Sequence, residues 1–317
     1  MPTVFITGAT GFIGQALCFK LKAMGWKVKA AFRGKCAPVC LPASVEAVSI
    51  ESIETHDNYL DDLMGVDAVI HLAARVHIVN DPATDVIDAF RKVNVLGTER
   101  LARIAAKAGV KRFIFISSVK VNGEGSSWPY TENDLPEPRD AYGVSKLEAE
   151  QAVARVACET GLQTVILRLP LVYGPGAKAN FKNLVKLVSS GLPLPFKSIR
   201  NRRSLIYLGN LVDAISVCVN HPLAAGETFM VSDGQDISTP DLIKAIAYAM
   251  NKKPALFSLH PRFLKALSNI FGKQEEAGKL TGTLVVDSSK IRNLLNWKPP
   301  FTLEDGLAET VAYYKKL

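Results

Sequence analysis

The sequence predicts an α/β protein, with a doubly wound parallel sheet and a smaller C-terminal α/β domain. A glycine-rich segment follows the first apolar run, and strand and helix patterns alternate through the first 170 residues. After Pro170 the pattern changes, and Pro and Gly become frequent between residues 174 and 195. Strands and helices that alternate in this way form parallel sheets with right-handed crossovers. We expect residues 1–170 to form the sheet domain and 171–317 the smaller domain, with some later segments returning to the first.

Short apolar runs are typical of strands that are buried on both faces of a parallel sheet. They predict strands at Thr3–Thr7, Lys27–Phe32, Ala68–Leu72, Arg112–Ser117 and Thr164–Leu169. Helical patterns lie between these runs, at about 12–24, 84–108 and 141–160. Gly25 and Gly161 follow two of the helices, where glycine commonly ends a helix.

The first strand leads directly into a Gly-x-x-Gly-x-x-Gly motif at Gly8, Gly11 and Gly14. The first glycine permits a tight strand-to-helix turn, the second lets the backbone approach a pyrophosphate, and the third lets the helix pack closely on the strand. Phosphates are favoured at a helix N-terminus by free N–H groups and by the helix dipole. The segment therefore predicts a dinucleotide site on a Rossmann-type sheet.

The net charge of +8 and the pI of about 9.2 indicate attraction for an anionic ligand. Lys and Arg are spread along the chain, so we expect no nucleic-acid partner; the densest group, Lys197–Arg203, is better suited to holding phosphate. No apolar run has the length of a membrane span, and the strand at Thr3 leaves no room for a signal peptide. We expect a cytoplasmic protein without a membrane partner.

The cysteine pattern predicts no metal site. The chain has 5 cysteines, of which Cys18 and Cys158 fall in helical patterns and are expected in the core. Cys36, Cys40 and His56 match no zinc-binding spacing.

A second motif, Tyr142-Gly-Val-Ser-Lys146, lies in the third predicted helix. The i, i+4 spacing places the phenol and the ammonium on one helix face, and a neighbouring ammonium lowers the pKa of a phenol. The phenol can then exchange a proton with a substrate hydroxyl or carbonyl. Ser117 and Ser118 end the fourth predicted strand, and ligands of such sheets bind at the carboxyl ends of strands. By itself each element also occurs by chance, as a surface pair or a strand-ending serine.

Together the motifs resemble the extended short-chain dehydrogenase/reductases, in particular the nucleotide-sugar epimerase/dehydratase/reductase group. The resemblance covers nearly the whole chain and includes Thr7–Gly14, His71–Ala74, Val93–Thr98, Val172–Gly176, Asp287–Lys290 and Leu295–Pro299. It implies a catalytic set of Ser118, Tyr142 and Lys146, and a homodimer formed through the helices at 84–108 and 141–160. The implied cofactor-binding residues are Gly8, Gly11, Phe12, Ile13, Gly14, Arg33, Leu72, Ala73, Ala74, Asn94, Ser117, Tyr142, Lys146 and Pro170. The implied UDP-sugar contacts are Ser118, Tyr142, Asn180 and Arg203.

The chain departs from the group at several positions. Dehydratases carry an acidic pair after the catalytic hydroxyl, whereas Val119 and Lys120 stand here, which argues against dehydration. Leu171 replaces an asparagine that often precedes the Tyr-Gly-Pro segment, and the Arg-x-x-Asp that often holds the nucleotide ribose is not evident near 277–280. These departures affect the substrate contacts and leave the redox centre complete.

The second predicted strand indicates which dinucleotide binds. It carries no acidic residue where NAD enzymes usually bond the ribose hydroxyls, and Arg33 can meet a 2′-phosphate there. The sequence therefore favours NADP(H), with NAD(H) as the other possibility.

Three functions are compatible with these features. The first is 4-ketoreduction of a UDP-4-keto-6-deoxy-N-acetylhexosamine for surface polysaccharide synthesis. Arg33 favours this function, because a net reductase needs exchangeable NADPH. The second is a UDP-glucose or UDP-N-acetylglucosamine 4-epimerase with tightly bound NAD. The third, remote alternative is a non-catalytic dinucleotide sensor, which would have no chemical need for the Tyr-Lys pair.

Overall fold

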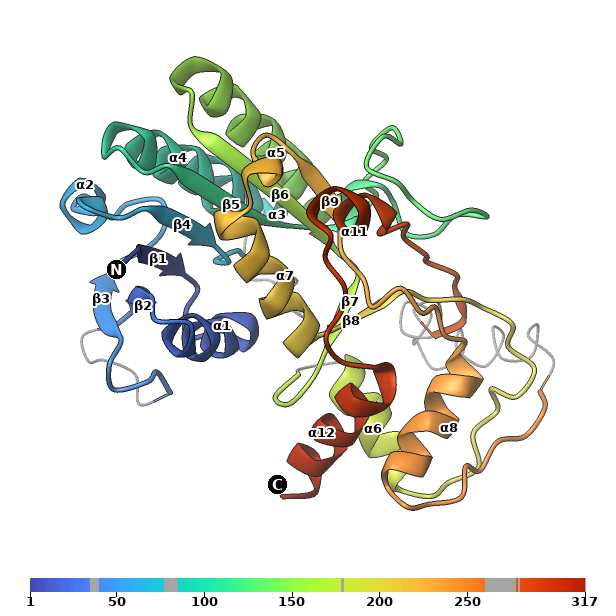
Figure 1. Cartoon of the computed structure of the whole chain (residues 1–317). Helices are drawn as coiled ribbons and strands as arrows, with labels where there is room; N and C mark the ends of the chain where they lie inside the picture. The colour runs from blue at the N-terminus through green and yellow to red at the C-terminus, as the bar shows by residue number, and fades with distance from the viewer. Residues whose placement is uncertain (35–39, 77–84, 178–179, 260–277, 279, 317) are drawn as a thin grey trace.

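The computed structural model describes residues 1–34, 40–76, 85–177, 180–259, 278 and 280–316. Its centre is a seven-stranded sheet in the order β3-β2-β1-β4-β5-β6-β9, in which every neighbouring pair is parallel. The strands are β1 (Thr3–Thr7), β2 (Lys27–Arg33), β3 (Glu46–Ile50), β4 (Ala68–His71), β5 (Arg112–Ser118), β6 (Gln163–Leu169) and β9 (Thr228–Met230) (Figure 1). The α/β prediction with a doubly wound parallel sheet is confirmed.

All five predicted strands are present, with ends that differ by at most one residue from those expected. The prediction missed β3, because its side chains are mostly exposed at the sheet edge and the segment has no continuous apolar run. Among the predicted helices, the first is α1 (Phe12–Ala23) and the third is α5 (Ala141–Thr160). Gly25 and Gly161 follow them with φ of +83° and +76°, as expected of glycines that end helices.

The long helix predicted at 84–108 consists of three consecutive segments, with residue 84 outside the described part. They are α3 (Val86–Arg91), η1 (Lys92–Leu96) and α4 (Gly97–Lys107). The middle segment has π-helical geometry, which often marks a functional position.

The chain after residue 170 contributes to two regions. β7 (Leu171–Tyr173) and β8 (Leu205–Tyr207) form a two-stranded parallel sheet. β9 returns to the main sheet beside β6, and α7 (Leu208–Asn220) packs against α1. α6 (Asn180–Ser189), α8 (Thr239–Ala249) and α12 (Leu303–Lys315) gather beyond the carboxyl ends of the strands (Figure 1). The shorter elements are α2 (Tyr59–Leu63), η2 (Val119–Val121), η3 (Pro222–Ala224) and α11 (Ser289–Leu295).

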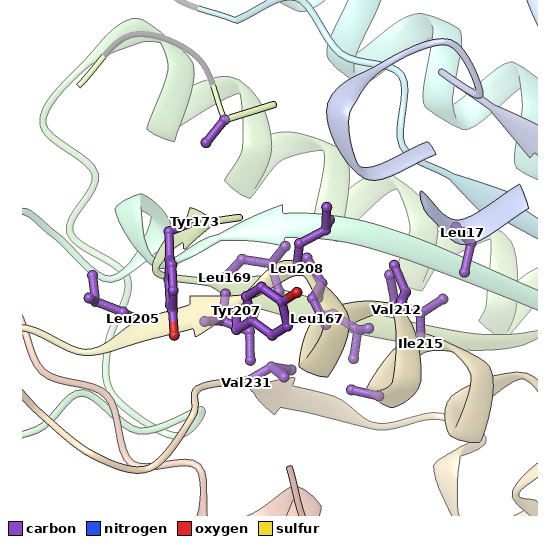
Figure 2. Close-up of a cluster of buried hydrophobic side chains, with 14 of the residues drawn as sticks. Leu17, Leu167, Leu169, Tyr173, Leu205, Tyr207, Leu208, Val212, Ile215 and Val231 are labelled. Carbon is purple, nitrogen blue, oxygen red and sulfur yellow. The ribbon is translucent and has the colours of Figure 1, made fainter. Parts of the chain in front are cut away.

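The core lies on both faces of the sheet. Along β1, Val4 and Ile6 belong to one buried cluster and Phe5 to the other, as the two-residue period of a strand requires. The first cluster runs from α1 through α7 to β7 and β8, where the rings of Tyr173 and Tyr207 lie close together (Figure 2). The sheet and the region after residue 170 therefore share one continuous apolar core.

The cysteines only partly match the expectation. Cys18 is buried in α1, but Cys158 is exposed near the end of α5, so its predicted core position is wrong. No helix among the described residues combines the length and apolar character that a membrane crossing requires.

Candidate active site

The glycine motif forms a bare helix N-terminus at the end of β1. Gly8 has a φ of +68°, and a Cβ built on Gly14 would lie 2.2 Å from the Gly8 carbonyl oxygen. Gly11 is the N-cap of α1, and no side chain caps the helix. The N–H groups of the first turn, at Phe12, Ile13 and Gly14, have no acceptor within the helix. This arrangement fits the pyrophosphate of a dinucleotide, because the donors are present and close approach is unobstructed.

A buried histidine fixes the wall beside this turn. His71, at the end of β4, contacts the Thr7 hydroxyl through Nδ1 at 2.6 Å and the Thr98 hydroxyl through Nε2 at 2.9 Å. Burial, with a smaller effect of the Lys146 charge, lowers the pKa of His71 to about 3, so the ring is neutral. Thr7 also accepts a hydrogen bond from the Ala73 N–H, at 3.3 Å. The half-buried segment Leu72, Ala73 and Ala74 is thereby placed next to Gly8.

Asn94 and Ser117 were predicted to bind cofactor, and both side chains make internal hydrogen bonds. Asn94 lies in the π-helical segment, where its Oδ1 accepts from the Arg75 N–H at 2.7 Å and its Nδ2 donates to the Ser145 hydroxyl at 2.9 Å. Ser117 donates to the Glu150 carboxylate at 2.5 Å. Both residues are buried supports of the site in this structure, and direct cofactor contact stays a prediction for them.

The three predicted catalytic residues come together where β5 ends and α5 begins. Ser118 and Tyr142 line the same cavity, and the Ser118 hydroxyl acts on the phenol by lowering its pKa. Lys146 is buried one helical turn further along α5, and its Nζ lies 4.1 Å from the centre of the Phe115 ring. The serine, tyrosine and lysine therefore occupy one small region at the carboxyl end of the sheet.

Burial dominates the titration of the Tyr-Lys pair. It raises the pKa of Tyr142 to about 12, with a further rise from the Asp140 charge and a decrease from the Ser118 hydrogen bond. Burial also lowers the pKa of Lys146 to about 7, and Glu150 counteracts part of this change. The expectation that the ammonium depresses the phenol pKa is therefore wrong for this structure. Tyr142 and Lys146 titrate as a coupled pair. When the pair loses one proton near neutral pH, the proton can come from the phenol while the lysine keeps its own.

A cavity of about 610 Å³ extends from the catalytic residues into the region after residue 170. Arg203 lines it, donates to the Gly282 carbonyl at 3.2 Å, and has a pKa lowered by burial. Pro170 lines it as well, whereas Asn180 begins α6 and its side chain lies outside the described part. The other described lining residues are largely apolar: Val119, Lys120, Leu169, Leu171, Val172, Phe181, Asn183, Leu184, Leu187, Leu205, Thr239, Leu242, Leu280 and Leu284.

Arg33 lies at the opposite end of the predicted dinucleotide site. It is exposed at the last position of β2 and pairs in register with Ile50 of β3. In Rossmann-type sheets this strand end faces the adenosine ribose. The placement is compatible with the predicted role of Arg33 and does not by itself select a dinucleotide.

The described residues contain no group of three or more His, Cys, Asp or Glu side chains able to hold a metal ion. Cys36 lies outside the described residues, and His56 bonds Asp62 at 2.8 Å.

Sequence reasoning did not predict the ion pairs that four charged residues form near the catalytic set. Glu150 and Arg168 form a buried ion pair at 2.7 Å, and Lys120 forms an ion pair with Asp140. Two signals were available: Glu150 follows Lys146 at i+4, and Arg168 interrupts an apolar strand, which requires a buried partner. Asp140 could have been found as the residue before the predicted helix, where Asp is a favoured N-cap.

Comparisons with known proteins identify the family of this chain. Residues 4–232 match the NAD dependent epimerase/dehydratase family. A Vibrio cholerae protein described as UDP-glucose 4-epimerase is 41% identical over 98% of this chain and 95% of its own length. An Escherichia coli O157:H7 protein described as N-acetyl-α-D-glucosaminyl-diphospho-ditrans,octacis-undecaprenol 4-epimerase is 27% identical over 98% and 94%.

Among solved structures, the Thermotoga maritima UDP-glucose 4-epimerase with UDP-glucose has a TM-score of 0.79 at 25% identity and covers 99% of both chains. A Bacillus cereus UDP-glucuronic acid 4-epimerase in complex with NAD has a TM-score of 0.80 at 24% identity, over 99% of this chain and 97% of its own. The second likeness concerns the fold. The NADP(H) preference predicted from Arg33 receives no support from these comparisons.

Proposed function

The chain belongs to the NAD dependent epimerase/dehydratase family, and from this premise we propose that it is a UDP-sugar 4-epimerase that retains NAD. The observation that carries the proposal is the cavity shared by Ser118, Tyr142 and Arg203, in a protein whose glycine turn after β1 leaves a helix N-terminus uncapped. A proton-transfer group, a hydroxyl that can hold the reacting oxygen and a phosphate-binding cation thus line one space. The 41% identical relative from Vibrio cholerae, described as UDP-glucose 4-epimerase, supports the same assignment.

Each residue has a distinct role in this proposal. Tyr142 removes the proton from the C4 hydroxyl of the sugar and returns it at the end of the cycle, while Ser118 donates a hydrogen bond to the same oxygen. Lys146 titrates together with the phenol, because the buried pair can lose one proton near neutral pH. The N–H groups of Phe12–Gly14 would hold the pyrophosphate of NAD, and the cofactor would supply reversible hydride chemistry at C4 of the sugar.

Arg203 is the described cation best placed for the substrate diphosphate. Arg203 lines the cavity, and its Nη1 already donates to the Gly282 carbonyl. A guanidinium has five N–H donors in a planar fork, so it can hold a carbonyl and phosphate oxygens together. Asn180 stays a predicted partner for the same diphosphate.

A second function, 4-ketoreduction with NADPH, is favoured by one observation. Arg33 is exposed at the end of β2, and no carboxylate follows it in residues 34–40 of the sequence. A 2′-phosphate would find a cation there, whereas the ribose hydroxyls of NAD would lack their usual acidic partner. The two functions therefore differ in the dinucleotide and in whether it must exchange.

The experiment that separates them begins with the freshly purified protein. Its bound dinucleotide is released by denaturation and identified by mass spectrometry. The native protein is then incubated with UDP-glucose or UDP-N-acetylglucosamine without added cofactor, and the C4 stereochemistry is followed by proton NMR. The epimerase proposal expects stoichiometric NAD and interconversion of the two C4 epimers, which Tyr142→Phe slows by about 10²–10⁴-fold.

Other results have defined meanings. An empty protein that binds NADPH more tightly than NADH and reduces a UDP-4-keto-6-deoxy sugar supports the reductase. A protein that binds a dinucleotide and turns over neither class of UDP-sugar contradicts both assignments and leaves the sensor. The predicted homodimer is checked on the same sample by analytical ultracentrifugation, where the monomer mass is 34.4 kDa.

A further inference from the structure

Lys120 follows the strand that carries Ser118 and forms an ion pair with the residue that begins the helix of Tyr142. It lies in η2, directly after β5, and its side chain lines the catalytic cavity. Its Nζ forms an ion pair with Asp140 and another with Glu124, the latter at 3.1 Å. One ammonium therefore meets two carboxylates at the edge of the candidate active site.

Asp140 has a structural task of its own at this place. It is the N-cap of α5 and accepts a hydrogen bond from the Gly143 N–H at 2.7 Å. The turn that contains Lys120 packs against the same helix end, since a Cβ on Gly143 would lie 2.8 Å from the Lys120 carbonyl oxygen. The carboxylate that starts α5 is thus held two residues before Tyr142, with Lys120 against it.

This capping carboxylate opposes the proposed chemistry of Tyr142. The charge of Asp140 raises the pKa of the phenol, in the same direction as burial. Among the described residues, the other groups that face Tyr142 are Ser118 from the end of β5 and the uncharged Phe90 ring from α3, at 6.3 Å between ring centroids. Lys146 lies one turn further along α5. A cation on Asp140 reduces the repulsion, because two opposite charges in contact act at a distance as a dipole.

We propose that Lys120 is a positioning residue for Tyr142: it neutralises Asp140, so that the carboxylate can cap α5 without opposing the negative charge that the Tyr142 oxygen carries during the reaction. The inference rests on the proposed function in that it assigns Tyr142 as the proton-transfer group. It also gives the departure at position 120 a reason, since an acidic side chain there would add to the charge of Asp140 and Glu124.

The test is a cycle of Lys120→Met, Asp140→Asn and the double variant. Asn caps helices about as well as Asp, so Asp140→Asn removes the charge and keeps the cap. Lys120→Met is expected to move the acidic limb of the kcat/KM profile to higher pH by on the order of one unit, since it unmasks a nearby charge. The double variant is expected to return the limb to within a few tenths of a unit of wild type.

Lys111→Met is the matched control, because Lys111 pairs with Asp67 at 3.3 Å before β5, at the other end of the strand; it should leave the limb in place. A merely structural Lys120 predicts a different pattern. Activity would then fall equally at all pH values, the limb would not move, and Asp140→Asn would restore nothing, which overturns the proposal.

A second readout tests the charge effect without turnover. The Cζ chemical shift of Tyr142, whose pKa is raised by burial to about 12, is followed from neutral pH up to the alkaline limit of the folded protein, so that the onset of ionisation is compared among variants. The protein is labelled with [ζ-¹³C]tyrosine, and Tyr142→Phe gives the assignment. Lys120→Met should delay ionisation and the double variant should restore it. If no UDP-sugar is turned over but this pattern is seen, the proposed function fails and the role of Lys120 stands. If the tyrosine shifts are unchanged among the variants, Lys120 has no such role.

Discussion

Replacement of Arg168 tests whether the buried ion pair behind the catalytic residues supports the fold. Its guanidinium donates to both Glu150 oxygens, with the closest contact 2.7 Å from Nη2 to Oε2, and Nη1 donates to Asn122 at 3.1 Å. The two charged side chains are only 7% and 6% exposed. In Arg168→Met the carboxylate keeps the Ser117 hydroxyl as a donor but loses every guanidinium donor.

An uncompensated buried charge costs about 3–5 kcal/mol. At about 2.1 cal/mol/K per residue, a chain of this length has an unfolding entropy of about 0.67 kcal/mol/K near its midpoint. The expected decrease in Tm is therefore about 5–8 °C. Differential scanning calorimetry gives both Tm and the enthalpy needed to convert the shift into a free energy.

The double variant Glu150→Gln/Arg168→Met identifies the cause. It removes both charges and leaves an amide that can still accept from Ser117, so it should recover most of the lost Tm. A loss below about 1 kcal/mol in Arg168→Met, or a double variant no more stable than the single one, would refute the reasoning. Either result would mean that water reaches the Glu150 carboxylate, or that the surrounding structure relaxes so that this carboxylate becomes exposed.

Three further predictions concern the cofactor turn, the proton pair and the last helix. Gly14→Ala should destabilise the fold by about 1–3 kcal/mol, because the new Cβ meets the Gly8 carbonyl. It should also weaken NADH binding, which is measured by fluorescence. Gly25→Ala is the control: its Cβ would have no atom within 4 Å, so NADH binding should be unchanged. The kcat/KM for sugar oxidation should increase with pH through about 7, because the Tyr142–Lys146 pair loses a proton there. Lys146→Met should remove this rise from the pH profile. An unchanged rise would contradict the role of the pair. Thr302→Ala removes the capping box of α12 and should lower the free energy of unfolding by about 1 kcal/mol, as measured by calorimetry. A variant as stable as wild type would contradict this prediction.

The sheet could be predicted because its signals are local. A parallel strand between two layers of helices is apolar on both faces, so β1 and β4–β6 appear as continuous runs. The apolar run is absent from a strand that is not buried on both faces. β3 is such a strand, because most of its side chains are exposed at the edge of the sheet. The return of β9 to the sheet is a long-range pairing with β6 that no local pattern contains.

The sequence could bring the candidate catalytic residues to one region of the fold, but it could not predict their electrostatics. Spacing alone places Tyr142 and Lys146 on one face of a helix, and a strand end places Ser118 nearby. The pKa values depend on burial, which here exceeds the effect of neighbouring charges on both groups. Asp140 and Lys120 lie 20 residues apart in sequence, so their ion pair depends on how η2 packs against α5.

The strand order explains why these separate signals meet at one place. From β1 the sheet continues to β2 and β3 on one side and to β4, β5 and β6 on the other. Such a reversal opens a crevice at the carboxyl ends of the two central strands, where ligands of doubly wound sheets bind. The glycine turn follows β1, the Leu72–Ala74 segment follows β4 and Ser118 ends β5, so all three border this crevice. Pro170, which directly follows β6, and Arg203, which precedes β8, both line the cavity. A dinucleotide in the crevice and a sugar in the cavity would therefore meet beside Tyr142.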